Sequence, residues 1–103
     1  MAKMRKKFGP LRKIIKPNLK KLPDKPGVYG IYTESGKLQK IGRAKRFRAD
    51  ERILESTNEI KQAKRQAKKF GFIPTKTVED AKELETRLIR KRKPPFNKEK
   101  KGK

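Results

Sequence analysis

Proline residues set the limits of regular secondary structure in this chain. Four of them fall within the first 26 residues, and Pro94 and Pro95 follow near the other end. Because proline lacks the amide hydrogen and clashes with the preceding helical turn, it is rare inside helices and central strands. We therefore expect an extended N-terminal arm with at most a short helix over residues 11–16. The pattern divides the chain into an arm (1–25), one folded domain (26–97) and a tail (98–103).

Basic residues are concentrated at the two ends. Residues 1–26 carry ten Lys or Arg against one acid, and residues 87–103 carry nine against one, within a net charge of +22. Each basic residue that neutralises a phosphate releases a condensed counterion, so such segments are typical of polyanion-binding proteins. Simple solubility is one alternative, and an anionic membrane surface is another, although Pro17 interrupts the helical apolar spacing that membrane binding would need. Nucleic acid, and not a membrane, is the predicted partner.

Two residue types that carry much of enzyme chemistry are missing. The chain has no cysteine and no histidine, which excludes disulfides, thiolate zinc sites, cysteine nucleophiles and Ser-His-Asp catalysis. Any catalysis must use carboxylate, tyrosine, lysine or arginine, and no motif for a small-molecule cofactor is evident. No apolar run is long enough to cross a bilayer, and no secretory signal follows the basic start. A cytoplasmic location is expected, and association with the nucleoid or the ribosome is compatible with it.

The middle of the chain begins with a predicted β-hairpin. Residues 28–32 are β-branched and aromatic, residues 33–36 favour a turn, and residues 37–41 can form the returning strand. Gly42 is expected to end that strand, where the backbone needs an unusual dihedral angle or a close approach. A hairpin of this kind supplies two strands of an antiparallel sheet.

Helical signals follow the hairpin. Asn58 and Thr77 are good N-cap residues, and Pro74 between them suits a strand at the edge of a sheet. The phenylalanines at 47, 70, 72 and 96 are expected in the core. The predicted elements are helices over 47–54, 58–70 and 78–92 and a short edge strand over 72–75. Their order indicates an α+β fold, with a small three-stranded antiparallel sheet flanked by helices and with basic extended arms.

One carboxylate lies on the apolar face of the last predicted helix. At about 100° per residue, Glu85 falls within the stripe formed by Val78, Ala81, Leu84 and Leu88. Burying an unpaired carboxylate is costly, so Glu85 has a cationic partner, binds a metal ion or faces a cleft at the edge of the stripe. A metal ion held here would be a hard cation such as Mg²⁺, with water and phosphate as its other ligands.

Two blocks of sequence resemble the GIY-YIG nuclease family. The first is PGVY (26–29) followed by KIGRAK (40–45), and the second is LETRLI (84–89) followed by KPPFN (93–97). The blocks stand in the family's order and spacing. The chain is similar to the N-terminal domain of the bacterial excision-repair incision subunit and to small stand-alone nucleases of the same family.

The resemblance implies a metal-dependent endonuclease that hydrolyses phosphodiester bonds of nucleic acid. It implies that Glu85 holds Mg²⁺ or another divalent cation, that Tyr29 lies near the attacking water and that Asn97 supports the site. Lys40 stands where the family has a second tyrosine, and an ammonium group there can assist the phosphate. Arg43 is expected to neutralise charge that develops during the reaction.

The arginine that the family places on its first helix is a departure in this chain. In a gapless alignment the position is Asp50, and helical phase predicts that Asp50 faces inward while Arg48 and Arg52 point away. Arg43, Arg46 or a shift of the helix could supply the missing charge. Cations next to the expected site are predicted to contact nucleic acid; these are Lys45, Arg46, Arg48, Arg90, Lys91, Arg92 and Lys93.

The same residues leave a second function open. The chain could be a catalytically degenerate protein of this fold that binds structured RNA, for example on the ribosome, or DNA without cutting it. Asp50, Lys40 and the two basic ends favour this alternative. Incubation with plasmid DNA and with structured RNA, in Mg²⁺ or in EDTA, would separate the two functions.

Overall fold

A computed structural model describes residues 8 and 10–97 of the chain, and the predicted tail at 98–103 lies outside them. Its elements are β1 (Arg12–Lys13), α1 (Lys16–Leu19), β2 (Gly27–Tyr32), β3 (Leu38–Ala44), α2 (Ala49–Gln62), β4 (Lys69–Pro74) and α3 (Val78–Arg92). The strands form one antiparallel sheet in the order β1-β4-β2-β3. The predicted α+β class is confirmed, and the sheet has a fourth strand because the arm contributes β1.

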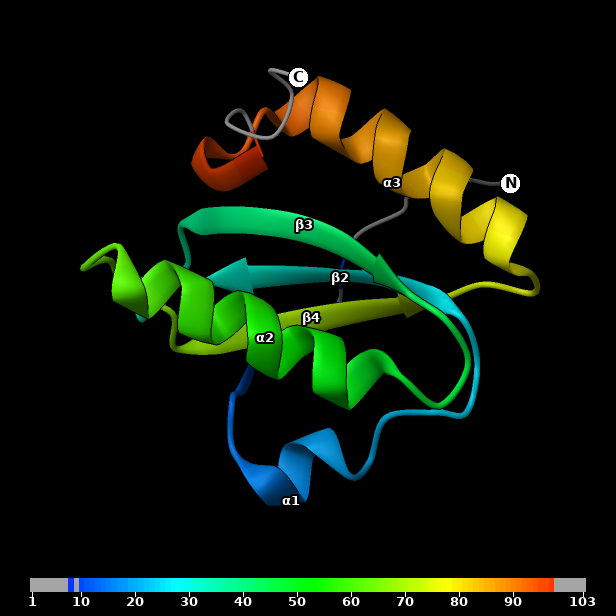
Figure 1. Ribbon diagram of the computed structural model, residues 1–103, viewed down its shortest axis with the longest axis horizontal. Coiled ribbons are helices and arrows are strands. Elements are labelled where there is room, and N and C mark those ends of the chain that lie inside the picture. The colour runs from blue at the N-terminus through cyan, green and yellow to red at the C-terminus, as the bar shows by residue number, and fades with distance from the viewer. Residues whose placement is uncertain (1–7, 9, 98–103) are drawn as a thin grey trace.

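Helices cover both faces of the sheet (Figure 1). One face packs against α3, and the other packs against α2 and α1. The first core cluster includes Val28, Ile41, Ala81, Leu84 and Leu88, and the second includes Leu19, Ile31, Ile53, Ile60 and Phe70. The central strand β2 is buried along its whole length. Within the described part of the chain, no helix has both the length and the apolar character needed to cross a bilayer.

The predicted hairpin and the predicted last helix are both confirmed. Gly36 adopts a φ of 94°, and its amide donates to the carbonyl of Thr33 to close the hairpin turn. The hydroxyl of Thr77 accepts the amide of Asp80 at 3.0 Å and caps the first turn of α3. The second strand differs in one respect, because β3 continues to Ala44 and contains Gly42, which was expected to end it.

The segment between the hairpin and α3 differs from the prediction. One helix, α2, and the strand β4 replace the helices expected over 47–54 and 58–70. Asn58 was expected to cap a second helix, but the chain is helical on both sides of it, and the hydroxyl of Thr57 donates to the carbonyl of Ile53 at 2.8 Å inside the continuous helix. Residues 69–74, which form β4, are extended and pair with β2 over six residues. This pairing supplies hydrogen-bond partners for their backbone.

Part of the arm packs on the sheet instead of extending from it. Phe8 and Leu19 are buried, one in each core cluster. The helix α1 spans 16–19 and not 11–16, because Pro17 fits the first turn of a helix and not its interior. The two residues of β1 pair with Lys69 and Phe70 at the start of β4. The strand predicted over 72–75 is the second half of β4, which pairs only with β2 and lies beyond the reach of β1.

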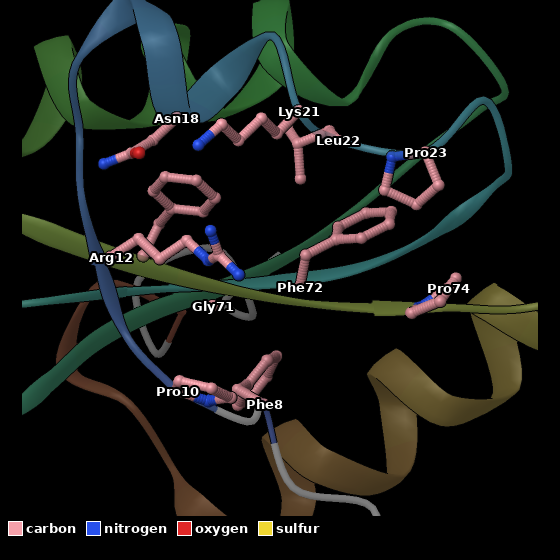
Figure 2. A pocket seen from close by; sticks show the side chains of 11 residues that line it. Phe8, Pro10, Arg12, Asn18, Lys21, Leu22, Pro23, Gly71, Phe72 and Pro74 are labelled. Carbon is pink, nitrogen blue, oxygen red and sulfur yellow. The ribbon is translucent and has the colours of Figure 1, made fainter.

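A cavity of about 360 Å³ lies between the arm and β4. Figure 2 shows Phe72 pointing from β4 toward Leu22 and Pro23 of the arm. No carboxylate is among the described residues that line this cavity, and its charged lining residues, Arg12 and Lys21, are both basic. Of the four phenylalanines expected in the core, Phe70 is buried, Phe72 and Phe96 are half-buried, and Phe47 is exposed.

Candidate active site

The edge strand β3 brings side chains from both faces of the sheet together. The helices α2 and α3 lie on opposite sides of it (Figure 1). A polar cavity of about 260 Å³ is present there, lined by Tyr29, Lys40, Ile41, Gly42, Arg43, Arg52, Glu55, Ser56, Glu59, Glu85 and Asn97. The structure therefore brings together all five residues that were predicted to be catalytic.

Tyr29 reaches the cavity because Gly42 has no side chain. The two residues pair across β2 and β3, and a Cβ atom on Gly42 would collide with the Tyr29 hydroxyl. That hydroxyl lies 2.7 Å from the Ser56 Oγ of α2, in a buried hydrogen bond that either group can donate. Burial raises the pKa of Tyr29, and the Ser56 hydrogen bond and the Arg52 charge offset only part of this rise. Tyr29 therefore keeps its proton at neutral pH.

Glu85 has a cationic partner and also faces the cavity. Arg43 Nη1 donates to Glu85 Oε1 at 2.7 Å, and the two side chains are 43% and 15% exposed, respectively. Two of the alternatives that the sequence left open for Glu85 therefore hold at the same time. It has a cationic partner, and it faces a cleft. Because Arg43 keeps substantial contact with solvent, its guanidinium can leave the carboxylate without becoming a buried unpaired charge.

Lys40 extends toward α2. It is buried, and its Nζ donates to Glu59 Oε1 at 2.7 Å. Lys40 lies on β3, the strand that pairs with the strand of Tyr29, and both side chains line the same cavity. The Lys40–Glu59 pair also joins β3 to α2 at the cavity.

The cation on α2 comes from Arg52, contrary to the prediction. Arg52 lines the cavity, and its Nη1 lies 3.6 Å from Glu55 Oε1. Asp50, expected to face inward, is exposed and accepts the amide of Glu51. The helical phase was wrong because Phe47 was taken as an inward anchor, whereas the buried face of α2 consists of Ala49, Ile53, Ser56, Thr57 and Ile60.

Asn97 pairs with the edge strand as a neighbouring strand would. Its Oδ1 accepts the amide of Ile41 at 2.7 Å, and its Nδ2 donates to the carbonyl of Ile41 at 2.9 Å. Both polar ends of the buried amide are therefore occupied. This contact ties the segment after α3 to the strand that carries Lys40 and Arg43.

A basic hollow of about 380 Å³ adjoins the cavity. It shares Arg43 and Arg52 with the cavity, and Lys45 and Arg48 extend its basic lining. Arg48 also forms an ion pair with Glu51 at 2.7 Å. Two of the predicted nucleic-acid contacts, Lys45 and Arg48, thus lie along a path that leads to Tyr29 and Glu85.

The other predicted contacts lie outside both spaces. Arg46 is exposed, and its Nε donates to the carbonyl of Asp24 at 3.2 Å. Arg90, Lys91 and Arg92 form the exposed last turn of α3, and Lys93 ends the helix with a left-handed φ of 46°. These residues line neither the cavity nor the basic hollow.

The donor set at the cavity fits a hard cation held mainly by ligands from outside the protein. Among residues 8 and 10–97, no three Asp or Glu side chains are grouped to hold a metal ion. Glu85 is a partly exposed carboxylate in a polar cavity. Mg²⁺ is usually bound by one or two carboxylates together with water and substrate phosphates. The residues present therefore fit Mg²⁺, and they do not fit a structural zinc ion with four protein ligands.

Residues 25–98 match the family described as the UvrC-like GIY-YIG domain. The UvrABC system protein C of Acetivibrio thermocellus is 36% identical over 88 residues, and that of Hyphomonas neptunium is 34% identical over 88 residues. The matches cover 81% and 82% of this chain and 14% of each relative. The chain thus spans a small part of the length of these curated relatives.

A solved structure shares the fold and the organisation of the sheet. It is the crystal structure of the GIY-YIG N-terminal endonuclease domain of UvrC from Thermotoga maritima, bound to its catalytic divalent cation, magnesium. The TM-score is 0.62 at 26% identity, and the match covers 90% of this chain and 98% of that domain. A point mutant of the same domain, bound to its catalytic divalent cation, also has a TM-score of 0.62.

Proposed function

The chain belongs to the UvrC-like GIY-YIG domain family, and we propose that it is a divalent-cation-dependent endonuclease that hydrolyses phosphodiester bonds of DNA. The domain shared with its relatives supports nuclease activity in general terms. One observation carries the proposal for this chain: Tyr29, Glu85 and three cations converge on one polar cavity. Such a cavity can hold a metal ion, orient a water molecule and neutralise a phosphate.

Glu85 is the residue that would hold the cation, and Mg²⁺ is the cation we infer. The Thermotoga maritima domain holds magnesium as its catalytic cation, and Glu85 meets the ligand preference of Mg²⁺. When bound, such a cation polarises a phosphoryl oxygen and lowers the pKa of a bound water. Arg43 donates to the Glu85 carboxylate at 2.7 Å, which orients the carboxylate toward the cavity.

Tyr29 would orient the attacking water and would not deprotonate it unaided. The raised pKa keeps the proton on the Tyr29 Oη at neutral pH. Ser56 fixes that oxygen at 2.7 Å from its own Oγ. With Ser56 donating to Tyr29, the phenol hydrogen is available for a water or a phosphate oxygen in the cavity.

Three cations would stabilise the charge that develops on the phosphate. Arg43 and Arg52 are long, partly exposed side chains that reach the cavity from β3 and α2. Arg52 supplies the helical cation that the gapless alignment does not provide. Lys40 is held by Glu59, so we assign it to the positive field of the cavity. Asn97 acts on the site through Ile41, as a positioning residue.

DNA would approach along the basic hollow. Lys45 and Arg48 would hold phosphates next to the cut site, and the exposed cations at Arg46 and at 90–93 would add contacts further away. A net charge of +22 favours this mode of binding, because phosphate neutralisation provides most of the affinity of sequence-independent contacts.

A nicking assay on supercoiled plasmid, with Mg²⁺ or with EDTA, tests the proposal. We expect nicking in Mg²⁺ only. Arg52→Ala should slow it by about 10²- to 10³-fold, whereas Arg87→Ala, which changes an exposed arginine of α3 outside the cavity, should leave the rate unchanged. Structured RNA under the same conditions provides the comparison substrate. Cleavage of RNA alone would refute the DNA assignment, and binding without cleavage of either would support the degenerate alternative.

A further inference from the structure

Phe47, in the loop between β3 and α2, has a backbone conformation that its side chain disfavours. Its φ is 66°, and the residue is 64% exposed. A left-handed φ is uncommon outside glycine, asparagine and aspartate, and it is a true outlier for a bulky residue. The prediction of a core position for Phe47 is wrong, so burial does not explain why a phenylalanine stands here. Strained residues of this kind are concentrated at functional sites.

One face of the Phe47 ring is covered by a cation and the rest is open. The guanidinium carbon of Arg46 lies 5.0 Å from the ring centroid, which is the geometry of a cation–π contact. The large exposed fraction of Phe47 leaves a surface of the ring accessible to a flat partner. A planar group stacked there would complete a sandwich of guanidinium, ring and partner.

The surroundings of the ring are basic. Phe47 lies between Arg46 and Arg48 in the sequence, and Arg48 and Lys45 line the hollow that shares two arginines with the catalytic cavity. Phe47 does not itself line the hollow, but the loop carries its exposed ring one residue before Arg48 and two residues after Lys45, which do line it.

We propose that Phe47 stacks on an unstacked base of the DNA strand whose phosphates lie in the basic hollow. This proposal rests on the proposed function and adds a base contact to a site otherwise made of phosphate contacts. Aromatic side chains beside a positively charged groove are the usual means of holding single-stranded nucleic acid, because every base has a flat face. Phe47 would thus favour DNA that is unpaired near the cut.

A protein partner fits this surface less well than a nucleic acid strand. An apolar protein surface placed on Phe47 would remove water from the adjacent guanidinium groups without offering them acceptors, which is costly. A DNA strand brings a base for the ring and phosphates for the cations in the same molecule, so both parts of the surface are satisfied together.

The first test separates stacking from charge. Phe47→Asn removes the ring, and asparagine accepts a left-handed φ, so the melting temperature should stay equal or rise. Affinity for a short oligothymidylate in EDTA should fall by about 5- to 100-fold. The slope of log Kd against log salt concentration should not change, because no charge is lost. Affinity for an abasic strand of the same length should be unaffected.

The second test observes the contact directly. The chain contains no tryptophan, so Phe47→Trp introduces a single tryptophan whose emission can be excited apart from that of the tyrosines. Its emission should be quenched when oligothymidylate binds, and Leu54→Trp, at an exposed apolar residue within α2, should show no comparable quenching. Equal quenching at both positions, or an unchanged affinity of Phe47→Asn for oligothymidylate, would overturn the proposal.

Both tests use binding in EDTA and are therefore independent of cleavage. A protein that shows the stacking signature and never cuts DNA would refute the proposed nuclease and leave the Phe47 contact standing. If the Phe47→Asn variant nicks plasmid normally and binds oligothymidylate as tightly as the unmodified chain does, the stacking contact alone is refuted.

Discussion

Replacing Glu85 with glutamine tests the central residue of the site with the smallest change in shape. If Glu85 holds the metal ion, as proposed, its loss removes about 4 kcal/mol of transition-state stabilisation. Since about 1.4 kcal/mol corresponds to a factor of ten in rate, nicking in Mg²⁺ should fall about a thousandfold. Affinity for DNA in EDTA should be equal or higher, because a negative charge near the phosphates is lost.

The stability of the same variant follows from the exposure of the ion pair. Arg43 is 43% exposed and Glu85 is 15% exposed, so the pair is partly solvated and is worth about 1 kcal/mol or less. The glutamine amide can still accept a hydrogen bond from Arg43. A loss of at most about 1 kcal/mol would lower the melting temperature by about 8 °C or less in a domain of this size. A fully buried pair would instead cost about 3–5 kcal/mol when one partner is removed.

Glu83→Gln is the matched control, because Glu83 is an exposed glutamate on the same helix that does not line the cavity. Nicking of supercoiled plasmid, circular dichroism melting and DNA binding would be measured on both variants. Unchanged nicking by Glu85→Gln would refute Glu85 as the metal ligand. A destabilisation beyond about 3 kcal/mol, together with no cleavage by the unmodified chain, would show that Glu85 has a structural role alone.

Three other outcomes are expected. Asn97→Ala removes both hydrogen bonds to Ile41 and should destabilise the domain by about 1–3 kcal/mol in a urea titration; an unchanged midpoint would mean that the edge strand does not need this clamp. Burial raises the pKa of Tyr29 and of Tyr32, so tyrosinate absorbance should appear only above pH about 10. Below that pH these phenols should not affect the free energy of unfolding. It should fall as the pH rises through their folded-state pKa values, and Tyr29→Phe should make this fall smaller. Affinity for DNA should fall by orders of magnitude between about 50 and 200 mM salt, and a flat salt profile would contradict the polyanion interpretation.

Elements with local signals could be predicted from the sequence. The hairpin turn needs Gly36 for its positive φ, and the start of α3 needs the Thr77 hydroxyl as a cap. Each signal is contained in four or five consecutive residues, so no knowledge of the tertiary structure is required. Pro94 likewise marks the end of α3 from the sequence alone.

The segment from α2 to β4 could not be predicted in the same way, because its conformation depends on partners far along the chain. Ser56 looked like part of a break, but its hydroxyl bonds Tyr29, which is 27 residues away. Gly71 looked like a helix terminus. It stands instead opposite Gly30 in the sheet, where a Cβ atom would collide with Phe8.

The residues of the site also fall into two groups, those that could be predicted from the sequence and those that were missed. Tyr29 was found through a resemblance, whereas Glu85 was found from its place on the apolar face of a helix and was then matched to the family, and the structure places both on the cavity. Arg52, Ser56 and Glu59 were missed, although their spacing of four and three residues puts them on one face of a continuous helix. Recognising a helix over 49–62 would have placed these three polar residues on one face, although only Ser56 among them is buried.

The charges around the cavity suggest how substrate and cofactor depend on each other. Three cations and three carboxylates line it, joined as Lys40–Glu59, Arg43–Glu85 and Arg52–Glu55. A divalent cation at Glu85 would compete with Arg43, and a phosphate would compete with Glu85 for Arg43. The divalent cation would free Arg43 to bind a phosphate, and the phosphate would free Glu85 to bind the cation. By linkage, each ligand should bind more tightly when the other is present. Calorimetric titration of Mg²⁺ into Tyr29→Phe, which keeps both charges, should give a tighter Kd with oligothymidylate present; an equal Kd would refute this coupling.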